Sequence, residues 1–397
     1  MQADISLKNC TACGHTPGNP LITIPNYPCV EGILYPENPF KNHKCDINIA
    51  VCDNCGTIYN LTRPPVAFLE DNYFRYYSPI IQENTSMGKY RQELFNCAFE
   101  YAGKTKGSVY QDSCQDGTLL HRFRDAGWTV AGNELDIHGE LARKQGMDIK
   151  RTNLRDAIIN EKYDLFLSAH VIEHMDDVTL YLKKIASLLN ENGKVVIQSP
   201  GFEDRLDAYG VFQWISCHAS YFSEATRRGV FARCGFEIDE ILHQMNGTQT
   251  VLARYTGRTS DYRADPALER EMLGKYDKKE KSLLTKLTDL LIEHIGEKDR
   301  LLFYGAGQAL TNILFYNPYL LKHEHVIVDI SQHKHGQRIQ LSPQPVSSPE
   351  SAVDFKPDTV IVASPGFQQE ILEVCKQLYT PTKAVTLMPE PSITSLN

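Results

Sequence analysis

The sequence predicts an α/β protein with two sheet-and-helix domains and a small β-rich module at its N-terminus. Short apolar runs alternate with helical segments between residues 107 and 256, and again between 301 and 378. This alternation is typical of parallel sheets covered by helices. Residues 1–70 instead carry six of the eleven cysteines, and their short apolar runs are bounded by Gly, Pro, Asn or Asp, which indicates strands joined by turns.

The composition narrows the classes of function. A chain of 397 residues is long enough for two or three domains, and its net charge of −8 includes no long basic run, which argues against a nucleic-acid or anionic-membrane partner. No apolar stretch approaches the roughly 20 residues of a membrane span. The start, MQADISLKNC, lacks the apolar core of a signal peptide. We therefore expect a cytoplasmic protein with a small-molecule substrate, and its oligomeric state stays open.

The first α/β domain is expected over residues 71–257. Residues 71–103 read as a polar, aromatic loop that leads into a helix. Strands are then expected at 107–113, 128–135, 163–169, 194–199, 236–243 and 248–256, with a further one before residue 153. Helices are expected at 118–127, 140–146, 178–193 and 224–235. Together they predict a seven-strand sheet.

Residues 258–280 are charged and poor in apolar side chains, which predicts a linker or an exposed helix. A helix with one apolar face follows at 281–299, and simple core packing explains that face. The alternation that begins at residue 301 then predicts a separate Rossmann-like domain over 281–397.

Two C-x-x-C pairs predict a zinc site in the N-terminal module, residues 1–70. A long segment separates Cys10 and Cys13 from Cys52 and Cys55, and a glycine follows each pair. Four thiolates suit a tetrahedral structural Zn²⁺ with no open position. The alternative is that these are reduced structural thiols or two redox pairs.

The turn after the first strand of the larger domain predicts a ligand site, because its backbone N–H groups and the following helix face the sheet edge. Its sequence is Gln-Asp-Ser-Cys-Gln-Asp-Gly, residues 111–117, in which Asp112, Asp116 and Gly117 are the candidates for cofactor contacts. Glu134 ends the next strand after this turn, where a carboxylate can accept both ribose hydroxyls. Its alternative is an exposed strand-end carboxylate. Asn153 could bond adenine, or could simply form a turn.

The fourth strand and the segment after it, residues 163–175, read YDLFLSAHVIEHM. This resembles the D-L-x-x-x-x-x-V-x-E-H segment of class I methyltransferases that use S-adenosylmethionine. The resemblance implies that the strand end, with Ser168 and His170, lies against the cofactor, and that the Glu-His pair is mostly structural. A packed or helix-capping histidine is the alternative for His170.

With the cysteine pairs and two further segments, the whole chain resembles the three-domain sugar C-methyltransferases of deoxysugar biosynthesis. The segment CHASYFS at 217–223 matches the family's Y-H-E-H-L-S-Y-F-S, and Tyr304-Gly305-Ala306 with Asp329, Lys334 and Gly336 matches its Y-G-A and D-x-x-x-x-K-x-G signatures. The resemblance implies a zinc-binding module, a class I methyltransferase domain and a Rossmann-like domain. It also implies a nucleotide-linked keto sugar as substrate.

The resemblance implies roles for single residues. His218 would be the base that removes a proton beside the 4-keto group, because an imidazole has an unperturbed pKa of about 6.5. Its alternative is a cap of the following helix. The tyrosines that the family places over its substrate correspond to Tyr73, Tyr76 or Tyr77, which could instead pack on the zinc module. Tyr221, Gly305 and Lys334 are further substrate-binding candidates.

Several positions depart from the family pattern. Ile215 and Cys217 replace a tyrosine and a glutamate near the histidine, and Ser113 and Gln115 replace glycines of the cofactor loop. These changes leave alternatives open: methylation of a different atom or of a different sugar, O- or N-methylation of another small metabolite, and a nucleotide-sugar-binding protein that has lost catalysis.

Overall fold

The computed structural model describes residues 7–29, 33–34, 43–64, 68–69, 86–135, 138–209, 214–244, 247–379 and 383–396. The chain forms two compact units, each assembled from several segments. Unit 1 comprises Met1–Leu21, Asn48–Asp204 and His218–Arg270, and unit 2 comprises Ile22–Ile47, Arg205–Cys217 and Glu271–Asn397. Residues 22–47, which were expected to fold with the zinc-binding module, thus group with the C-terminal part of the chain.

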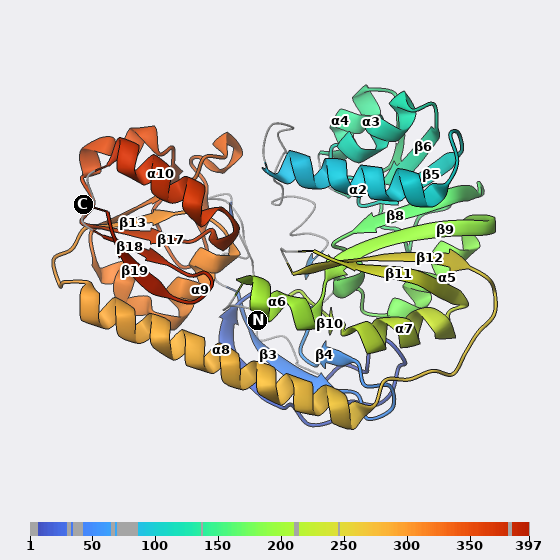
Figure 1. Cartoon of the computed structure of the whole chain (residues 1–397), viewed down its shortest axis with the longest axis horizontal. Coiled ribbons are helices and arrows are strands. Elements are labelled where there is room, and N and C mark those ends of the chain that lie inside the picture. Colours follow the sequence, from blue (N-terminus) through green and yellow to red (C-terminus); the bar gives the residue numbers. More distant parts are fainter. Residues whose placement is uncertain are drawn as a thin grey trace. The chain divides into compact units, whose positions relative to one another are not determined.

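Unit 1 is built on a seven-stranded sheet with the order β11-β12-β9-β8-β5-β6-β7 (Figure 1). Its strands are β5 (Ser108–Asp112), β6 (Thr129–Asn133), β7 (Asp148–Lys150), β8 (Tyr163–Ala169), β9 (Leu189–Pro200), β11 (Phe236–His243) and β12 (Thr248–Tyr255). The five strands from β9 to β7 pair in parallel, whereas β12 runs antiparallel to both neighbours. The carboxyl ends of the parallel strands therefore meet at one edge, where such sheets bind ligands.

Helices cover both faces of this sheet (Figure 1). On one face lie α2 (Ser86–Ala102), α3 (Thr118–Asp125) and α4 (Gly139–Lys144); on the other lie α5 (Val178–Ser187) and α7 (Glu224–Arg233). Leu94 of α2 and Phe123 of α3 pack in one core cluster, and Tyr181 of α5 and Phe231 of α7 pack in another. A short helix η1 (Ile172–His174) follows β8, and α6 (Phe202–Tyr209) follows β9. The predicted α/β fold class is confirmed.

One predicted element is wrong in its extent. A helix was expected over 178–193, but α5 ends at Ser187 and β9 already begins at Leu189. Leu189 pairs with Tyr163 of β8, and the polar residues 190–193 form an irregularity before Lys194 resumes the register opposite Leu165. Pairing with β8 thus overrides the local helical pattern.

A small antiparallel sheet carries the N-terminal module of unit 1. Strand β3 (Lys44–Val51) passes from unit 2 into unit 1, where its last residues pair with β4 (Ile58–Asn60). On its other side β4 pairs with β10 (Ser220–Tyr221), with Tyr221 opposite Ile58. Strand β10 begins just after His218, so the module is joined by backbone pairing to the predicted catalytic segment.

Unit 2 contains the second α/β domain, with the strand order β16-β14-β13-β17-β18-β19. Its strands are β13 (Leu301–Tyr304), β14 (His325–Val328), β16 (Val346–Ser347), β17 (Thr359–Val362), β18 (Lys383–Thr386) and β19 (Ser392–Ser395). All pair in parallel except β19, which is antiparallel to β18. Two core clusters lie on the sheet, one with α9 (Gln308–Tyr316) and α8 (Pro266–His294), the other with α10 (Gln368–Leu378).

The remaining elements of unit 2 come from both ends of the chain. Strand β1 (Ile22–Pro28) lies against α9, since the Tyr27 hydroxyl donates to Asn312 Oδ1 at 2.6 Å. Strand β2 (Ile33–Leu34) pairs with β15 (Arg338–Ile339). Short 3₁₀ helices are η2 (Pro318–Lys322), η3 (Gln332–Lys334), η4 (Glu350–Phe355) and η5 (Pro365–Phe367).

Helix α8 begins within residues 258–280, so much of the expected linker is helical. Among the described residues, none of the helices combines the length and the apolar character that a membrane crossing requires.

Candidate functional site

The four cysteines of the two C-x-x-C pairs come together in unit 1. The Cys10 and Cys55 sulfurs lie 3.7 Å apart, and those of Cys13 and Cys52 lie 3.5 Å apart; all four lie within 4.8 Å of one another. A tetrahedral zinc with Zn–S bonds of about 2.3 Å separates its sulfurs by about 3.8 Å. A disulfide would instead bring two sulfurs to about 2.05 Å. The cluster therefore has the spacing of a four-thiolate metal site.

The two cysteine pairs form the same turn, and that turn depends on glycine. Gly14 donates its N–H to Cys10 O and Gly56 donates to Cys52 O, both at 2.9 Å. Both glycines have a positive φ, +69° and +77°, which other residues adopt only at a cost. The repeated turn aims both thiols of each pair at one point.

The cysteine module contacts the larger sheet domain at several points. The Thr11 and Ser220 hydroxyls lie 2.6 Å apart, which links the first pair to β10. Thr179 of α5 donates its hydroxyl to Ala12 O at 2.9 Å. The module is thus a support for the segment that contains His218.

The predicted cofactor loop follows β5 and keeps the backbone shape of a glycine-rich turn. Gly117 has φ +78°, and a Cβ there would lie 2.7 Å from the Ala142 Cβ, so this position requires glycine. Ser113 and Gln115, which replace glycines of the family pattern, also have positive φ, +50° and +53°. The loop has therefore lost two glycines without losing the conformation that they favour.

The loop is tied to its surroundings by its own amides and side chains. Gln115 donates its backbone N–H to Glu134 Oε2 at 2.7 Å. Asp116 Oδ1 accepts from Thr118 N and from Arg91 Nη1 of α2, both at 3.0 Å. Glu134 is 7% exposed, so the carboxylate predicted to bind ribose stands buried at the end of β6 and against the loop.

Asp112 ends β5 inside a closed network of polar groups. Its Oδ1 accepts from Asn133 Nδ2 and its Oδ2 from the Tyr181 hydroxyl, each at 2.7 Å. The same hydroxyl lies 2.8 Å from Ser168 Oγ. Burial raises the pKa of Asp112, and the bonds from Tyr181 and Asn133 oppose that rise. Asp112 and Ser168 thus belong to a hydrogen-bond network within the sheet beneath the loop.

Asn153 forms a turn. Its Oδ1 accepts from Asp156 N and its Nδ2 donates to Asp156 Oδ2, both at 2.8 Å. This matches the turn alternative that the sequence left open, and an adenine contact would have to share these groups.

A cluster of imidazoles surrounds a buried carboxylate after β8. Glu173 is 2% exposed, and His170 Nδ1 lies 3.4 Å from its Oε1. The rings of His174 and His218 meet edge to face with centroids 4.8 Å apart. Burial alone would raise the pKa of Glu173, but His170, His174 and His218 together hold it at about 2. The carboxylate of Glu173 therefore stays charged at neutral pH.

His218 is 7% exposed and is held by backbone bonds of its neighbour Ala219. Ala219 donates its N–H to Glu173 O at 2.7 Å, and Ala219 O accepts from Asn60 N at 3.1 Å. The Tyr221 ring lies 5.8 Å from the His218 ring.

His170 is placed at the end of β8 in a left-handed conformation, with φ +57°. Its Nε2 lies 3.5 Å from the Tyr90 hydroxyl of α2. Tyr73, Tyr76 and Tyr77, which were predicted to lie over the substrate, fall outside the described residues.

The candidates of unit 2 meet at the carboxyl end of its central strand. Gly305 follows β13 with φ +104°, and a Cβ there would lie 2.1 Å from Ser364 Oγ. Lys334 Nζ bonds Asp329 Oδ2 at 2.7 Å and Ala306 O at 2.9 Å, while Ala306 donates its N–H to the same Asp329 oxygen. Lys334 therefore closes the turn that contains Gly305.

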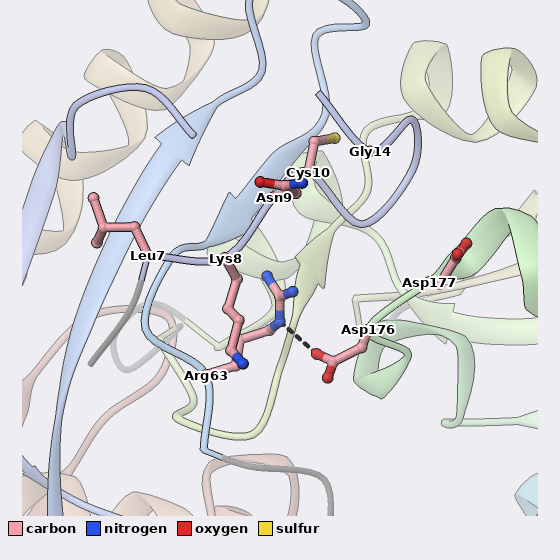
Figure 2. A pocket seen from close by; sticks show the side chains of 8 residues that line it. All are labelled: Leu7, Lys8, Asn9, Cys10, Gly14, Arg63, Asp176 and Asp177. Atoms are coloured by element: carbon pink, nitrogen blue, oxygen red, sulfur yellow. Dashed lines mark hydrogen bonds and ion pairs between the residues drawn. The ribbon is translucent and has the colours of Figure 1, made fainter. Parts of the chain in front are cut away.

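A pocket of about 450 Å³ lies beside the cysteine cluster (Figure 2). Figure 2 shows the Arg63 guanidinium directed at Asp176, with Nε 2.6 Å from Oδ1. Of the residues predicted for function, Cys10 alone lines it. Because its two cations and two aspartates offset one another, it offers no strong preference for a charged ligand.

The structure adds contacts that the sequence did not reveal. The Glu-His pair was predicted to be mostly structural, and in the structure the imidazole of His174 meets that of His218. Arg91 was not selected at all, because an arginine inside a polar helix carries no motif. Only the fold brings it to the cofactor loop.

Two protein-family models match the chain. Residues 88–241 match "Methyltransferase domain" and residues 261–389 match "C-methyltransferase C-terminal domain". No curated protein matches. The two matched domains, on the fold described above, identify a methyltransferase.

Solved structures of low identity resemble part of the chain. A Burkholderia thailandensis 1,6-didemethyltoxoflavin-N1-methyltransferase shares 14% identity over 57% of this chain and 99% of its own, with a TM-score of 0.38. An amino pentose methyltransferase from Micromonospora echinaspora shares 13% over 45% and 99%, with a TM-score of 0.37. An S-adenosylmethionine-dependent methyltransferase from Clostridium acetobutylicum shares 12% over 48% and 98%, with a TM-score of 0.36.

Proposed function

We propose that this methyltransferase transfers a methyl group to a carbon atom of a nucleotide-linked keto sugar, with His218 as the base. The observation that carries the proposal is the cluster after β8, in which the rings of His218 and His174 meet edge to face and both lower the pKa of the buried Glu173. A carbon acid needs a positioned base whose pKa lies near the operating pH, and the imidazole of His218 in this cluster supports that role. The matched C-methyltransferase C-terminal domain supports the same reaction.

The residues at the sheet edge fit S-adenosylmethionine. Glu134 offers a buried carboxylate at the end of β6, suited to the ribose hydroxyls. The turn 113–117 keeps left-handed residues, which let a ligand approach the backbone closely. His170 at the end of β8 completes this edge, and Asp116 supports it through the start of α3. When bound, the cofactor supplies an electrophilic methyl group.

His218 would accept the proton from the carbon beside the keto group on a ring nitrogen. The electron pair of that C–H bond would then be free to attack the electrophilic methyl group that S-adenosylmethionine, held by Glu134 and the turn 113–117, would supply. The negative charge of Glu173 stabilises the imidazolium that results. The developing oxyanion needs a donor, a role that we assign to one of Tyr73, Tyr76 and Tyr77.

The substrate class follows from the resemblance and agrees with the charge of the chain. Tyr221 lies beside His218 and is assigned to the sugar. Gly305 and Lys334 of unit 2 stay substrate-binding candidates that the resemblance implies. The acidic net charge of −8 fits a small ligand better than a nucleic acid.

The alternative is O- or N-methylation of a small metabolite. It is favoured by Ile215 and Cys217, which are both 7% exposed and remove two polar groups that a keto sugar would use. Oxygen and nitrogen acceptors need less basic assistance than a carbon acid, so such a reaction would tolerate their loss.

We also propose that the cysteine cluster holds a structural Zn²⁺. Its four thiols fill all four positions of a tetrahedral site, so no position is left for water or substrate. The role of the metal would be to fix β4, and through it β10 and the His218 segment.

Proton abstraction can be tested apart from methyl transfer. The wild-type protein and His218→Ala are incubated in D₂O with S-adenosylhomocysteine and a thymidine-diphosphate-linked 4-keto-6-deoxy sugar. We expect wild-type protein to exchange the proton beside the keto group faster than buffer does, and His218→Ala to lose that excess. Equal exchange by both proteins would remove His218 from the role of base. Methyl transfer from S-adenosylmethionine in a parallel assay, without such exchange, would favour the O- or N-methylation alternative.

A further inference from the structure

The cofactor loop holds a residue in a conformation that its side chain disfavours. Gln115 has φ +53°, in the left-handed region where a non-glycine residue is disfavoured by about tenfold. The structure must therefore provide contacts that keep Gln115 there. Its backbone supplies one of them, the N–H bond of 2.7 Å to Glu134 Oε2.

The second contact comes from α2. Arg91 Nη2 donates to Gln115 Oε1, and Arg91 Nη1 pairs with Asp116 Oδ1 at 3.0 Å. The Arg91 and Asp116 side chains are 13% and 11% exposed, so solvent screens this ion pair little. The Arg91 guanidinium thus bonds two consecutive residues of the loop.

Helix α2, which carries Arg91, is held in place by core packing. Leu94 and Ala98, further along α2, are buried at 6% and 0% exposure in the core cluster that also contains Leu119 and Leu120 of α3. Because α2 is packed against the helix that the loop starts, Arg91 cannot follow the loop if the loop moves. The planar guanidinium also orders its partners with little loss of its own freedom.

We propose that Arg91 is a positioning residue that replaces the glycine missing at position 115. By bonding Gln115 and Asp116 it keeps the loop in the left-handed conformation that we propose receives the cofactor. The inference rests on the proposed placement of S-adenosylmethionine at this loop. It differs from a direct contact, in which Arg91 would bind the carboxylate of the cofactor itself.

A rescue experiment separates these two roles. We would measure S-adenosylhomocysteine binding by calorimetry for wild-type protein, Arg91→Ala, Gln115→Gly and the double variant. Glycine adopts positive φ without support, so Gln115→Gly removes the need for the contacts that Arg91 makes with the loop. Arg124→Ala is the matched control, because Arg124 lies on α3 and donates to Gln145 O, away from the loop. If Arg91→Ala does not fold, Arg91→Lys replaces it in both single and double variants, since lysine cannot make the forked contact.

Arg91→Ala should weaken binding by about tenfold, and the double variant should return to within about twofold of Gln115→Gly. Arg124→Ala should bind as wild type does. A double variant as weak as Arg91→Ala alone would overturn the inference and leave Arg91 as a direct ligand of the cofactor. Unchanged binding by Arg91→Ala would overturn it as well. Failure of the wild-type protein to bind would instead refute the cofactor placement, and the inference would fall with it.

Discussion

Tyr181 is the hydroxyl donor beneath the cofactor loop, and its replacement by phenylalanine tests how that loop is supported. The hydroxyl lies 2.7 Å from Asp112 Oδ2 and 2.8 Å from Ser168 Oγ, and the residue is 6% exposed. A hydrogen bond to a charged group contributes about 1.5–3 kcal/mol and a neutral one about 0.5–1.5 kcal/mol. Tyr181→Phe should therefore lower the free energy of unfolding by about 2–4 kcal/mol.

The loss should also depend on pH. Burial raises the pKa of the Asp112 carboxyl, and the hydrogen bond from Tyr181 opposes that rise. Removal of the hydroxyl in Tyr181→Phe should therefore raise this pKa further. A carboxyl whose pKa is higher in the folded state loses stability as the pH rises from its unfolded value, about 3.9, through the folded value. The difference between variant and wild type should thus be smallest in acid and grow toward neutral pH.

Calorimetric unfolding of both proteins at pH 4.5 and pH 8 measures the two effects. Tyr163→Phe is the matched control, because Tyr163 packs in the same core cluster but forms no hydrogen bond through its hydroxyl among the described residues. We expect that control to lower stability by less than Tyr181→Phe does, because it removes no hydrogen bond within the described part of the chain. A loss for Tyr181→Phe no larger than the control's, or equal at both pH values, would refute the network described for Asp112.

Three further predictions follow from the site. Cys52→Ser should release the metal and reduce turnover more than S-adenosylhomocysteine affinity, because the module supports His218 rather than the loop; metal analysis and calorimetry check this, and an unchanged metal content would contradict it. Glu134→Gln should weaken S-adenosylhomocysteine binding by about 2 kcal/mol, roughly 30-fold, since it removes a charged acceptor; affinity within twofold of wild type would exclude Glu134. Ser113→Gly should raise the free energy of unfolding by about 0.5–1 kcal/mol, because glycine adopts the left-handed conformation without the strain that Ser113 carries. A loss of stability in denaturant titration would show instead that a contact of the Ser113 side chain stabilises the fold by more than this strain costs.

The sequence predicted the strand–helix order of unit 1 well, because apolar periodicity and turn residues act locally. It failed at 188–193, where β9 begins at Leu189, before the expected start at position 194. The pairing of Leu189 with Tyr163 decides that boundary, and a partner on another strand leaves no local pattern. The sequence also carried no sign that residues 22–47 group with the C-terminal domain.

The site shows the same division between local and distant information. The C-x-x-C pairs were found because two ligands in one turn fix their own spacing, and the structure brings both pairs to one cluster. Glu134 was selected from its position at a strand end and His218 from the family resemblance, and both roles stay predictions. Arg91 and the partners of Glu173 were not selected from the sequence, because their contacts depend on distances between separate elements.

The measurement that tests the central claim most directly is the identity of the methylated atom. The protein would be incubated with S-adenosylmethionine labelled with ¹³C in its methyl group and a panel of nucleotide-linked 4-keto sugars, and the product examined by ¹H–¹³C correlation NMR. We predict a methyl signal coupled to a sugar carbon in at least one product, absent with His218→Ala. A methyl signal at the shift of an O-methyl or N-methyl group would contradict C-methylation, and no transfer to any sugar would contradict the proposed substrate class.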